Sequence, residues 1–437
     1  MEYDLNRGMW KLFNLCVFLI LNLNADSSFE FELIKKGQEN NNTLLVVGGI
    51  QGDEPGGFMA ASILSTHYEI KKGSLWVVPN LNFYSIIQRG RGVYGDMNRK
   101  FKYLPQDDPE YTIVERIKHH INEPQVKIVV NLHDGSGYYR TKYIDALHSP
   151  DRWGQCSIID QAYLENHQYG DLESISAQVV EHVNQNLIRV EDRYGVRNTQ
   201  TREGNAEMEK TLTYYAINQG KAAFGNEASK SLPTHERVYY HLLALEKYMQ
   251  IAGIEFERKF SLTPRGVYGA INNDIYISLY DDRIRLPLSQ VRDVLSFVPL
   301  KKDAELQFKG SNPLLTMYKD DNCYLIQYGN RRLARIKPEH MEYDDISAKV
   351  LFEIDGKERF VEFGEIVDVK KSFIAKDEEN FRINVIGYST SAPKESGVEI
   401  QRQQILKRYS VDKEGKVYRV EYYNQNRFCG MVLVKFI

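Results

Sequence analysis

Continuous apolar strands alternate with helices along residues 43–251, and this alternation constrains the fold more than any other feature of the chain. Strands that are apolar at nearly every position are buried on both faces. The helices between them cover those faces, as in an α/β domain with a mostly parallel, twisted sheet and helices on both sides. We expect strands at 43–49, 74–81, 126–134 and 221–229, and helices at 55–68, 109–122, 173–188 and 235–253.

The pattern changes after residue 253. Short segments with alternating apolar residues follow one another, separated by turn signals such as "NND", "DGK" and "KEGK". This pattern is typical of β structure with tight turns. We expect two small all-β domains, at 253–342 and 343–437, that either bind and orient a partner or act as scaffold alone.

The N-terminus has the pattern of a signal peptide. Lys11 precedes an apolar run from Leu12 to Leu23, and Ala25 supplies a small residue for cleavage. The run is short for a membrane span and suits the apolar region of a signal peptide. We therefore expect residues 1–25 to direct export, and the alternative is an uncleaved N-terminal anchor.

Net charge and cysteine content argue against nucleic acid binding, a disulfide framework and a cysteine zinc site. A formal net charge of −3 gives no reason to expect nucleic acid binding. After the apolar run the cysteines are Cys156, Cys323 and Cys429, and no two have the C-x-x-C spacing of a cysteine zinc site. We expect neither a disulfide framework nor a cysteine-bound metal.

Polar residues stand where the predicted strands of the sheet end. In an open parallel sheet, ligands bind beyond the carboxyl ends of the strands, so these residues are expected to meet at one place. They are Gln51 and Glu54 after the first strand, Arg91, Asn98 and Arg99 after the second, His133 at the end of the third, and Glu227 at the end of the fourth.

Gln51, Glu54 and His133 are the candidate metal ligands. A hydrolytic zinc keeps three protein ligands and one open position for water. Glu54 and His133 are common ligand types, and Gln51 stands three residues before Glu54, a spacing that lets both side chains point to one side. The amide oxygen of Gln51 is a weaker donor than an imidazole. The alternative is a glycine-rich turn in which Gln51 hydrogen-bonds to the backbone.

The stretch "RGRGVYGDMNRKF" (89–101) offers a binding site for a carboxylate. Arg99 presents a planar fork suited to a carboxylate, and Asn98 adds donors. Arg91 is a candidate to polarise a scissile carbonyl and stabilise the oxyanion. Trp153, in the loop after the strand that carries His133, is a candidate to line a substrate pocket. The alternatives are a solvated basic loop and surface packing of the tryptophan.

Glu227 is the candidate general base. It follows an apolar stretch in "FGNEAS". A carboxylate in such a place can take a proton from water and pass it to a leaving amine. The alternative is an acidic residue at a helix N-terminus, where it interacts with the helix dipole.

These residues resemble the motifs of the zinc metallocarboxypeptidases of the M14, or carboxypeptidase A-like, family. That family has H-x-x-E, then D-x-N-R-x-F, then a later histidine and a catalytic glutamate. The corresponding residues here are Gln51-Gly-Asp-Glu54, then Asp96-Met-Asn98-Arg99-Lys-Phe101, then His133 and Glu227. The resemblance covers about half of the chain and implies a zinc carboxypeptidase domain at 26–252.

A glutamine in the place of the first histidine, a signal peptide and a β-rich tail make the chain similar to the periplasmic peptidoglycan DL-carboxypeptidases that set cell shape in helical bacteria. Such enzymes trim the muropeptide tripeptide stem to a dipeptide and release meso-diaminopimelate. The resemblance implies a periplasmic enzyme whose β domains contact murein or other cell-wall proteins. It also implies roles for named residues: one Zn²⁺ on Gln51, Glu54 and His133, the substrate carboxylate on Asn98 and Arg99, the oxyanion on Arg91, and Glu227 as base.

Two other functions stay open. A deacylase similar to aspartoacylase or succinylglutamate desuccinylase would share the Asn-Arg pair, but the signal peptide and the long β tail disfavour it. A pseudo-peptidase that binds muropeptides without hydrolysing them is the second alternative, and Gln51 is the reason for it.

Overall fold

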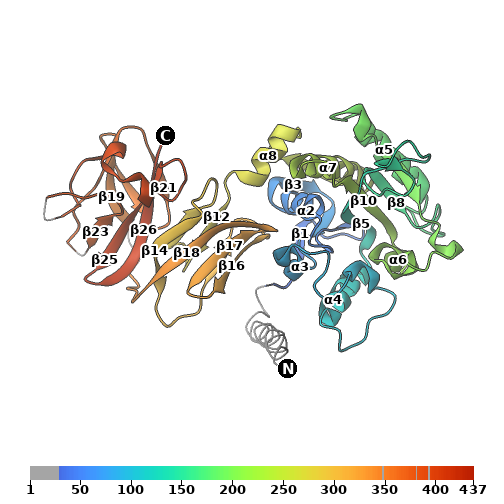
Figure 1. Ribbon diagram of the computed structural model, residues 1–437, viewed down its shortest axis with the longest axis horizontal. Coiled ribbons are helices and arrows are strands. Elements are labelled where there is room, and N and C mark those ends of the chain that lie inside the picture. The colour runs from blue at the N-terminus through green and yellow to red at the C-terminus, as the bar shows by residue number, and fades with distance from the viewer. Residues whose placement is uncertain (1–28, 347–348, 380, 392–393) are drawn as a thin grey trace, which may run out of the picture. The chain divides into compact units, whose positions relative to one another are not determined.

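The computed structural model describes residues 29–346, 349–379, 381–391 and 394–437 (Figure 1). The chain divides into two compact units, of which the first ends at Tyr268 and the second is Gly269–Ile437. The predicted signal peptide, residues 1–25, lies outside the described residues. Within the described ranges no helix combines the length and the apolar character of a membrane span.

The first unit is built around a seven-stranded sheet. Its strands are β1 (Ile34–Gly37), β2 (Thr43–Val47), β4 (Ser74–Val78), β5 (Val126–Gly135), β8 (Cys156–Ile159), β9 (Gly195–Asn198) and β10 (Ala222–Ser229). Their order across the sheet is β1-β4-β2-β5-β10-β8-β9. The central strands β4, β2, β5 and β10 are parallel, whereas β1 is antiparallel to β4 and β8 to β10. The prediction of a mostly parallel α/β sheet is confirmed.

Helices cover both faces of this sheet (Figure 1). On one face α2 (Pro55–His67) packs against α7 (Thr234–Ile251), and α7 packs against α5 (Leu172–Asn184). On the other face α4 (Tyr111–Asn122) and α6 (Leu212–Asn218) contact β5. Every residue of β2 and β4 is buried, as expected for strands between two helical layers.

The first unit extends past the predicted boundary at residues 252 and 253. The strand β11 (Glu255–Arg258) pairs with β3 (Tyr68–Lys72) in antiparallel fashion. Arg258 Nε also lies 2.7 Å from Oε1 of Glu246 in α7. These contacts place the start of the predicted β domain in the first unit, and α8 (Pro264–Asn272) spans the change from one unit to the next.

The described residues of the second unit form four sheets. Their orders are β13-β12-β15, β14-β18-β17-β16, β20-β19-β22-β24 and β21-β26-β25-β23. The strands of the first two are β12 (Tyr276–Leu279), β13 (Ile284–Pro287), β14 (Val294–Lys301), β15 (Phe308–Gly310), β16 (Leu315–Asp320), β17 (Cys323–Tyr328) and β18 (Arg331–Met341). The strands of the last two are β19 (Lys349–Ile354), β20 (Lys357–Glu362), β21 (Ile366–Val369), β22 (Ser372–Ala375), β23 (Arg382–Val385), β24 (Ile400–Gln401), β25 (Val417–Asn424) and β26 (Arg427–Phe436).

The second unit contains most of the residues of the two predicted β domains, 253–342 and 343–437. Sheet membership does change between β18 and β19, near the predicted boundary at residues 342 and 343. The last two sheets share a core that includes Phe352, Phe373 and Tyr422. Arg419 in β25 joins this part to the preceding one, because its guanidinium donates to the carbonyl oxygens of Ser296 and Phe297.

Candidate active site

Sheet register brings the ends of the central strands together. Val47, the last residue of β2, pairs with Asn131 of β5, and His133 lies two residues further along β5 on the same face. Glu227 of β10 pairs with His133 in the neighbouring parallel ladder. The side chains of His133 and Glu227 therefore project from the same face of the sheet, at the edge where β2 ends.

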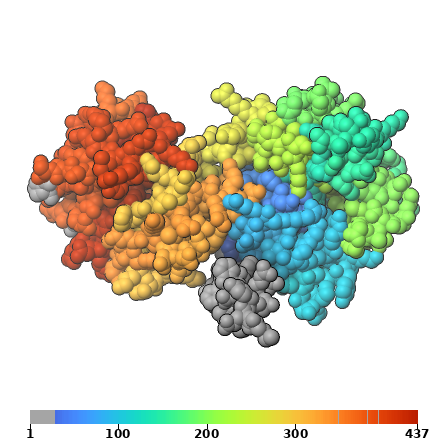
Figure 2. Space-filling view, viewed as in Figure 1, coloured from blue at the N-terminus to red at the C-terminus, as the bar shows by residue number. Residues whose placement is uncertain are grey.

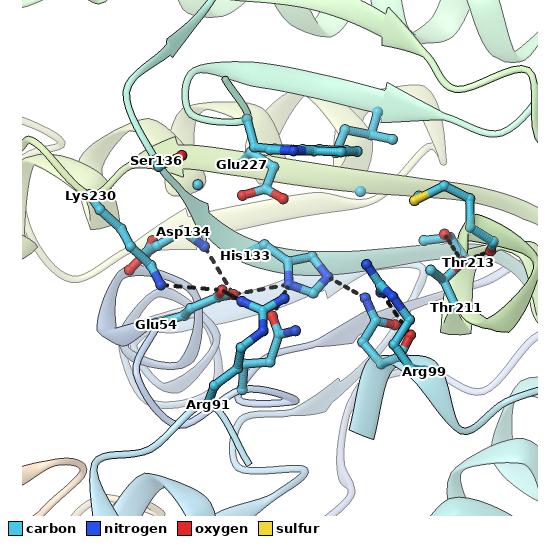
Figure 3. Close-up of a pocket in the computed structure, with 17 residues that line it drawn as sticks. Glu54, Arg91, Arg99, His133, Asp134, Ser136, Thr211, Thr213, Glu227 and Lys230 are labelled. Carbon is cyan, nitrogen blue, oxygen red and sulfur yellow. Dashed lines mark hydrogen bonds and ion pairs between the residues drawn. The ribbon is translucent and has the colours of Figure 1, made fainter. Parts of the chain in front are cut away.

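A cavity of about 250 Å³ opens at this edge (Figure 3). In the space-filling view, the blue segment after β4 borders the light-green segment that includes α6 (Figure 2). All eight site residues named from the sequence line the cavity: Gln51, Glu54, Arg91, Asn98, Arg99, His133, Trp153 and Glu227.

The three candidate metal ligands converge on one point. Oε1 of Gln51 and Oε2 of Glu54 each lie 3.0 Å from Nδ1 of His133. All three side chains are buried. The amide of Gln51 is bonded to side chains, because its Nε2 donates to Oδ1 of Asp96 at 2.7 Å. This geometry does not agree with a Gln51 that serves only to hydrogen-bond the turn backbone.

The three donor atoms fit a divalent metal. A zinc ion about 2.1 Å from each of its tetrahedral ligands keeps neighbouring ligand atoms about 3.4 Å apart, close to the spacing seen here. Among the residues that the structure describes, no three His, Cys, Asp or Glu side chains form a group that could hold a metal. The amide oxygen of Gln51 is therefore needed to complete a ligand set.

Asn131 gives a second observation in favour of a metal. Its Oδ1 is buried without a hydrogen-bond partner in the described part of the chain, whereas its Nδ2 lies 2.8 Å from Nε2 of His133. With a metal on Nδ1, the proton of the imidazole is on Nε2 and needs an acceptor. If the side-chain amide of Asn131 is rotated by 180°, its Oδ1 takes the place of Nδ2 and accepts this proton. The two orientations have the same shape and differ only in the assignment of the oxygen and nitrogen atoms.

The turn that carries Glu54 is rich in glycine because the chain passes very close to its neighbours. A Cβ on Gly52 would lie 2.1 Å from the carbonyl oxygen of Ser85, and one on Gly56 would lie 2.2 Å from Oδ1 of Asp134. The amide of Gly56 instead donates to Oδ2 of Asp134 at 2.7 Å. The turn is thus fixed against both α3 (Phe83–Gln88) and β5.

Asp134 connects this edge of the sheet to two helices. Besides Gly56 of α2, it contacts Arg237 Nη1 at 2.9 Å and His241 Nε2 at 3.3 Å, both from α7. Burial opposes ionisation of Asp134, but the hydrogen bond and charge of His241 and the charge of Arg237 outweigh it and keep the pKa of Asp134 below its usual value. The residue next to His133 is therefore a charged anchor.

Glu227 is a buried carboxylate with a free oxygen. Its Oε2 has no hydrogen-bond partner among the described residues. Burial raises the pKa of Glu227 to about 8, His133 opposes this rise, and the negative charges of Glu54 and Asp134 add to it. A carboxylate whose pKa lies near neutral pH is suited to take and return protons. The alternative role at a helix N-terminus is wrong, because Glu227 lies within β10 and α7 begins at Thr234.

Glu54 also changes the titration of His133. Burial lowers the pKa of His133, but the hydrogen bond and charge of Glu54, with the charges of Glu227 and Asp96, outweigh burial and raise the pKa. A proton on Nδ1 of His133 faces the oxygens of Gln51 and Glu54, which is where a divalent cation bound by the three residues would lie. The cluster is therefore built to hold positive charge at this point.

Asn98 and Arg99 form one wall of the cavity. Both belong to the 3₁₀ turn η1 (Met97–Arg99). Oδ1 of Asn98 accepts a hydrogen bond from the backbone of Leu212 at 3.0 Å, which leaves Nδ2 directed toward His133, 3.4 Å from Nε2. Arg99 is 31% exposed, and its Nε lies 3.5 Å from Oε2 of Glu207. Its Nη1 also donates to the carbonyl oxygen of Asn98 at 3.1 Å, and the partly exposed guanidinium lines the cavity.

Arg91 lies beside the metal ligands. Its Nη1 is 3.3 Å from Oε1 of Glu54, and its Nη2 is 3.0 Å from Oδ2 of Asp96. Figure 3 shows Arg91 next to Glu54, whereas Arg99 lies on the side of Thr211 and Thr213. The two arginines therefore reach the cavity at different places.

Several residues that line the cavity were not predicted from the sequence. Trp153, which was found, is half-buried, with the guanidinium of Arg197 3.6 Å from the centre of its ring. Lys230 could have been found, because it follows Glu227 by three residues at the end of the same strand. Asp134, Gly135 and Ser136 follow His133, and Gly225 precedes Glu227, so they lie beside predicted site residues. Four other lining residues stand next to no recognisable motif: Ile158, Met208, Thr211 and Thr213.

Comparison with known proteins decides which family has this site. The model of a family described as "Carboxypeptidase controlling helical cell shape catalytic" matches residues 7–272. The chain belongs to this family. A second model, the "C-terminal domain of metallo-carboxypeptidase", matches residues 343–437. The metallocarboxypeptidase resemblance of the motifs is thus confirmed, and the chain is a peptide hydrolase of this class.

Solved structures of the Cell Shape Determinant protein Csd4 from Helicobacter pylori are similar to this carboxypeptidase over almost its whole length. The apo structure of Csd4 is 39% identical to this chain, with a TM-score of 0.83. The match covers 93% of this chain and 100% of the Csd4 chain. The tripeptide-bound structure has the same values. A form bound to mDAP and described as a D,L-carboxypeptidase is 40% identical over 92% of this chain. No curated protein sequence matches the chain.

Proposed function

We propose that this carboxypeptidase is a zinc-dependent D,L-carboxypeptidase that releases meso-diaminopimelate from the tripeptide stem of peptidoglycan and leaves a dipeptide. The similarity to Csd4, whose structures hold a tripeptide and mDAP, supports this substrate. The observation that carries the proposal is the convergence of Gln51, Glu54 and His133 between a buried carboxylate and an Asn-Arg pair.

Recognition of a free carboxylate makes the enzyme an exopeptidase. Arg99 and Nδ2 of Asn98 are donors on the wall opposite Glu227, and the planar fork of an arginine suits a carboxylate. Trp153, Thr211 and Thr213 also line the cavity, where they can contact the side chain of the departing residue. An internal peptide bond offers no carboxylate to this pair and is not a substrate.

The residues around the metal ligands divide the chemistry among them. Zinc, when bound by Gln51, Glu54 and His133, supplies a Lewis acid and makes water a better nucleophile. Glu227 takes the proton from the attacking water at Oε2 and gives it to the leaving amine. Arg91 donates to the oxygen of the scissile carbonyl as negative charge develops there.

We further propose that the enzyme works in the periplasm and holds one zinc ion per chain. The predicted signal peptide at residues 1–25 supports export, and the substrate class is a component of the cell wall. A role for the second unit in binding murein or other cell-wall proteins stays a prediction. The family match over residues 7–272 and 343–437 disfavours the aspartoacylase-like alternative.

Mass spectrometry of digested muropeptides tests this function. Purified wild type should convert tripeptide muropeptides to dipeptides with release of diaminopimelate, and should contain zinc by elemental analysis. Glu227→Ala should retain zinc and lose turnover by at least about 100-fold, the contribution typical of a general base. Glu173→Ala, at an exposed position on α5, is the matched control and should behave as wild type.

Two results would contradict different parts of the proposal, the first the hydrolytic function and the second the role of Glu227. A wild-type protein without zinc and without zinc-dependent turnover would support the pseudo-peptidase alternative. Normal hydrolysis by Glu227→Ala would leave the function intact and show that another residue is the base.

A further inference from the structure

Lys230 is a cation of the active-site cavity for which the proposed mechanism gives no role. Its Nζ lies 2.7 Å from Oδ2 of Asp53 and 3.6 Å from Oε1 of Glu54. Its backbone amide donates to the carbonyl oxygen of Gly135 at 2.7 Å, so the start of the side chain is fixed to the end of β5. The side chain is 32% exposed and lines the cavity.

Lys230 lies on the side of the site opposite the Asn-Arg pair. Figure 3 shows Lys230 and Ser136 on one side of Glu54 and His133, and Arg99 and Thr213 on the other. If the terminal carboxylate binds at Arg99 and the scissile carbonyl lies at the metal ligands, the rest of the substrate leaves toward Lys230. The residue before the scissile bond is therefore the one that meets this lysine.

That residue carries a free carboxylate in the proposed substrate. In the bacterial tripeptide stem the scissile bond is formed by the side-chain carboxyl of D-glutamate, so its α-carboxylate is unblocked. Four single bonds of about 1.5 Å separate the scissile carbonyl carbon from this carboxylate carbon, a reach of about 5 Å. Because Nζ of Lys230 is 3.6 Å from Oε1 of Glu54, whose other carboxylate oxygen faces His133, the substrate carboxylate falls within reach of the lysine.

We propose that Lys230 binds the free α-carboxylate of the residue that precedes the scissile bond, and so selects a γ-linked acidic residue at that position. This inference rests on the proposed function. An ammonium group has three donors, and the ion pair with Asp53 uses one of them. A second donor is directed to Glu54 by the ion pair at 3.6 Å, and the third is left for a carboxylate in the cavity that Lys230 lines.

Amidation of the α-carboxylate tests the proposal. The two substrates are L-Ala-γ-D-Glu-meso-diaminopimelate and its D-isoglutaminyl counterpart, which differ only in that group. Wild type should prefer the free acid by about tenfold in kcat/KM, the lower end for a hydrogen bond to a charged group, because Lys230 is partly exposed. Lys230→Met should lose this preference through slower cleavage of the acid alone, and Lys230→Arg should keep most of it.

Lys142→Met, at an exposed position outside the cavity, is the matched control and should keep the wild-type ratio. An unchanged ratio in Lys230→Met would overturn the proposal. An equal loss of kcat/KM on both substrates would also overturn it, because it would mean that the lysine only positions Asp53 and Glu54.

A binding measurement separates this inference from the proposed function. In a Glu227→Gln background, calorimetry should show about tenfold tighter binding of the acid than of the amide, and Lys230→Met should remove the difference. Failure of wild type to cleave either substrate would contradict the proposed function. The binding ratio would still decide the role of Lys230.

Discussion

Asp96 should control zinc affinity although it is not among the candidate ligands. Its Oδ1 accepts hydrogen bonds from Nε2 of Gln51 at 2.7 Å and from the backbone of Asn98 at 3.0 Å. Its Oδ2 lies 3.0 Å from Nη2 of Arg91. Because Asp96 holds the nitrogen of the Gln51 amide, the oxygen of that amide must face His133. Asp96→Asn keeps the shape of the side chain and removes its charge.

The size of the effect follows from these contacts. An asparagine has one acceptor where the carboxylate has two, so one of its amide hydrogens must face either Gln51 or Arg91. Hydrogen bonds that lose an ionised partner weaken to roughly half. Loss of a partner that orients a metal ligand typically lowers metal affinity by about 10- to 100-fold, or about 1.4–2.8 kcal/mol. We expect Asp96→Asn to fall in this range.

A competition titration with a chelator of known affinity measures the change directly. Thermal unfolding gives a second readout, since each tenfold loss of affinity removes about 1.4 kcal/mol of zinc-dependent stabilisation. Asp171→Asn is the control, because Asp171 caps α5 by accepting from the backbone of Ser174, and asparagine caps a helix equally well. Wild-type zinc affinity in Asp96→Asn would show either that Asp96 does not orient Gln51 or that Gln51 is not a ligand.

Two further predictions concern Gln51 and Asp160. Gln51→His should bind zinc at least about tenfold more tightly and keep some activity, because imidazole is the stronger donor, and an unchanged affinity in the same titration would count against Gln51 as a ligand. Burial raises the pKa of Asp160 against the hydrogen bonds of its threonine neighbours. The folded state therefore holds the proton more tightly than the unfolded state, and wild-type stability falls as pH rises from the unfolded pKa of about 3.9 through the folded pKa. The free energy of unfolding of Asp160→Asn lacks this fall. Between pH 4 and pH 7 the stability of the variant relative to wild type should therefore increase. Urea unfolding that shows the same stability difference at both pH values would refute this prediction.

The central strands could be predicted because their burial on both faces is visible in the sequence. All residues of β2 and β4 are apolar or small and buried. The strands β8 and β9 were not predicted, since four residues such as "GVRN" carry no pattern of their own. Their pairing is set by the neighbouring strand β10 and by α5. The boundary of the first unit was missed for a similar reason, because β11 is recognisable only through its long-range partner β3.

The candidate site could be predicted where a motif follows a strand. Glu227 and His133 end strands that are adjacent in the sheet, so sequence position and topology together place them. Thr211 and Thr213 could not be found in this way. They reach the cavity because Asn98 accepts from the backbone of Leu212, a contact between residues far apart in the chain. Local pattern contains no information about such a bond.

Gln51 can take the place of a histidine because its amide keeps both interactions of a metal-bound imidazole, one with the metal and one with a carboxylate. A metal-bound imidazole gives one nitrogen to the metal and donates the other N–H to a carboxylate. The amide of Gln51 has the same two-sided arrangement, with Oε1 toward His133 and Nε2 donating to Asp96. The negative charge of Asp96 draws positive charge toward the nitrogen and leaves the amide oxygen more negative, which offsets its weaker donation. A glutamine without a carboxylate behind it would lack this compensation, so Gln51 and Asp96 should act as a pair whose substitutions do not add independently.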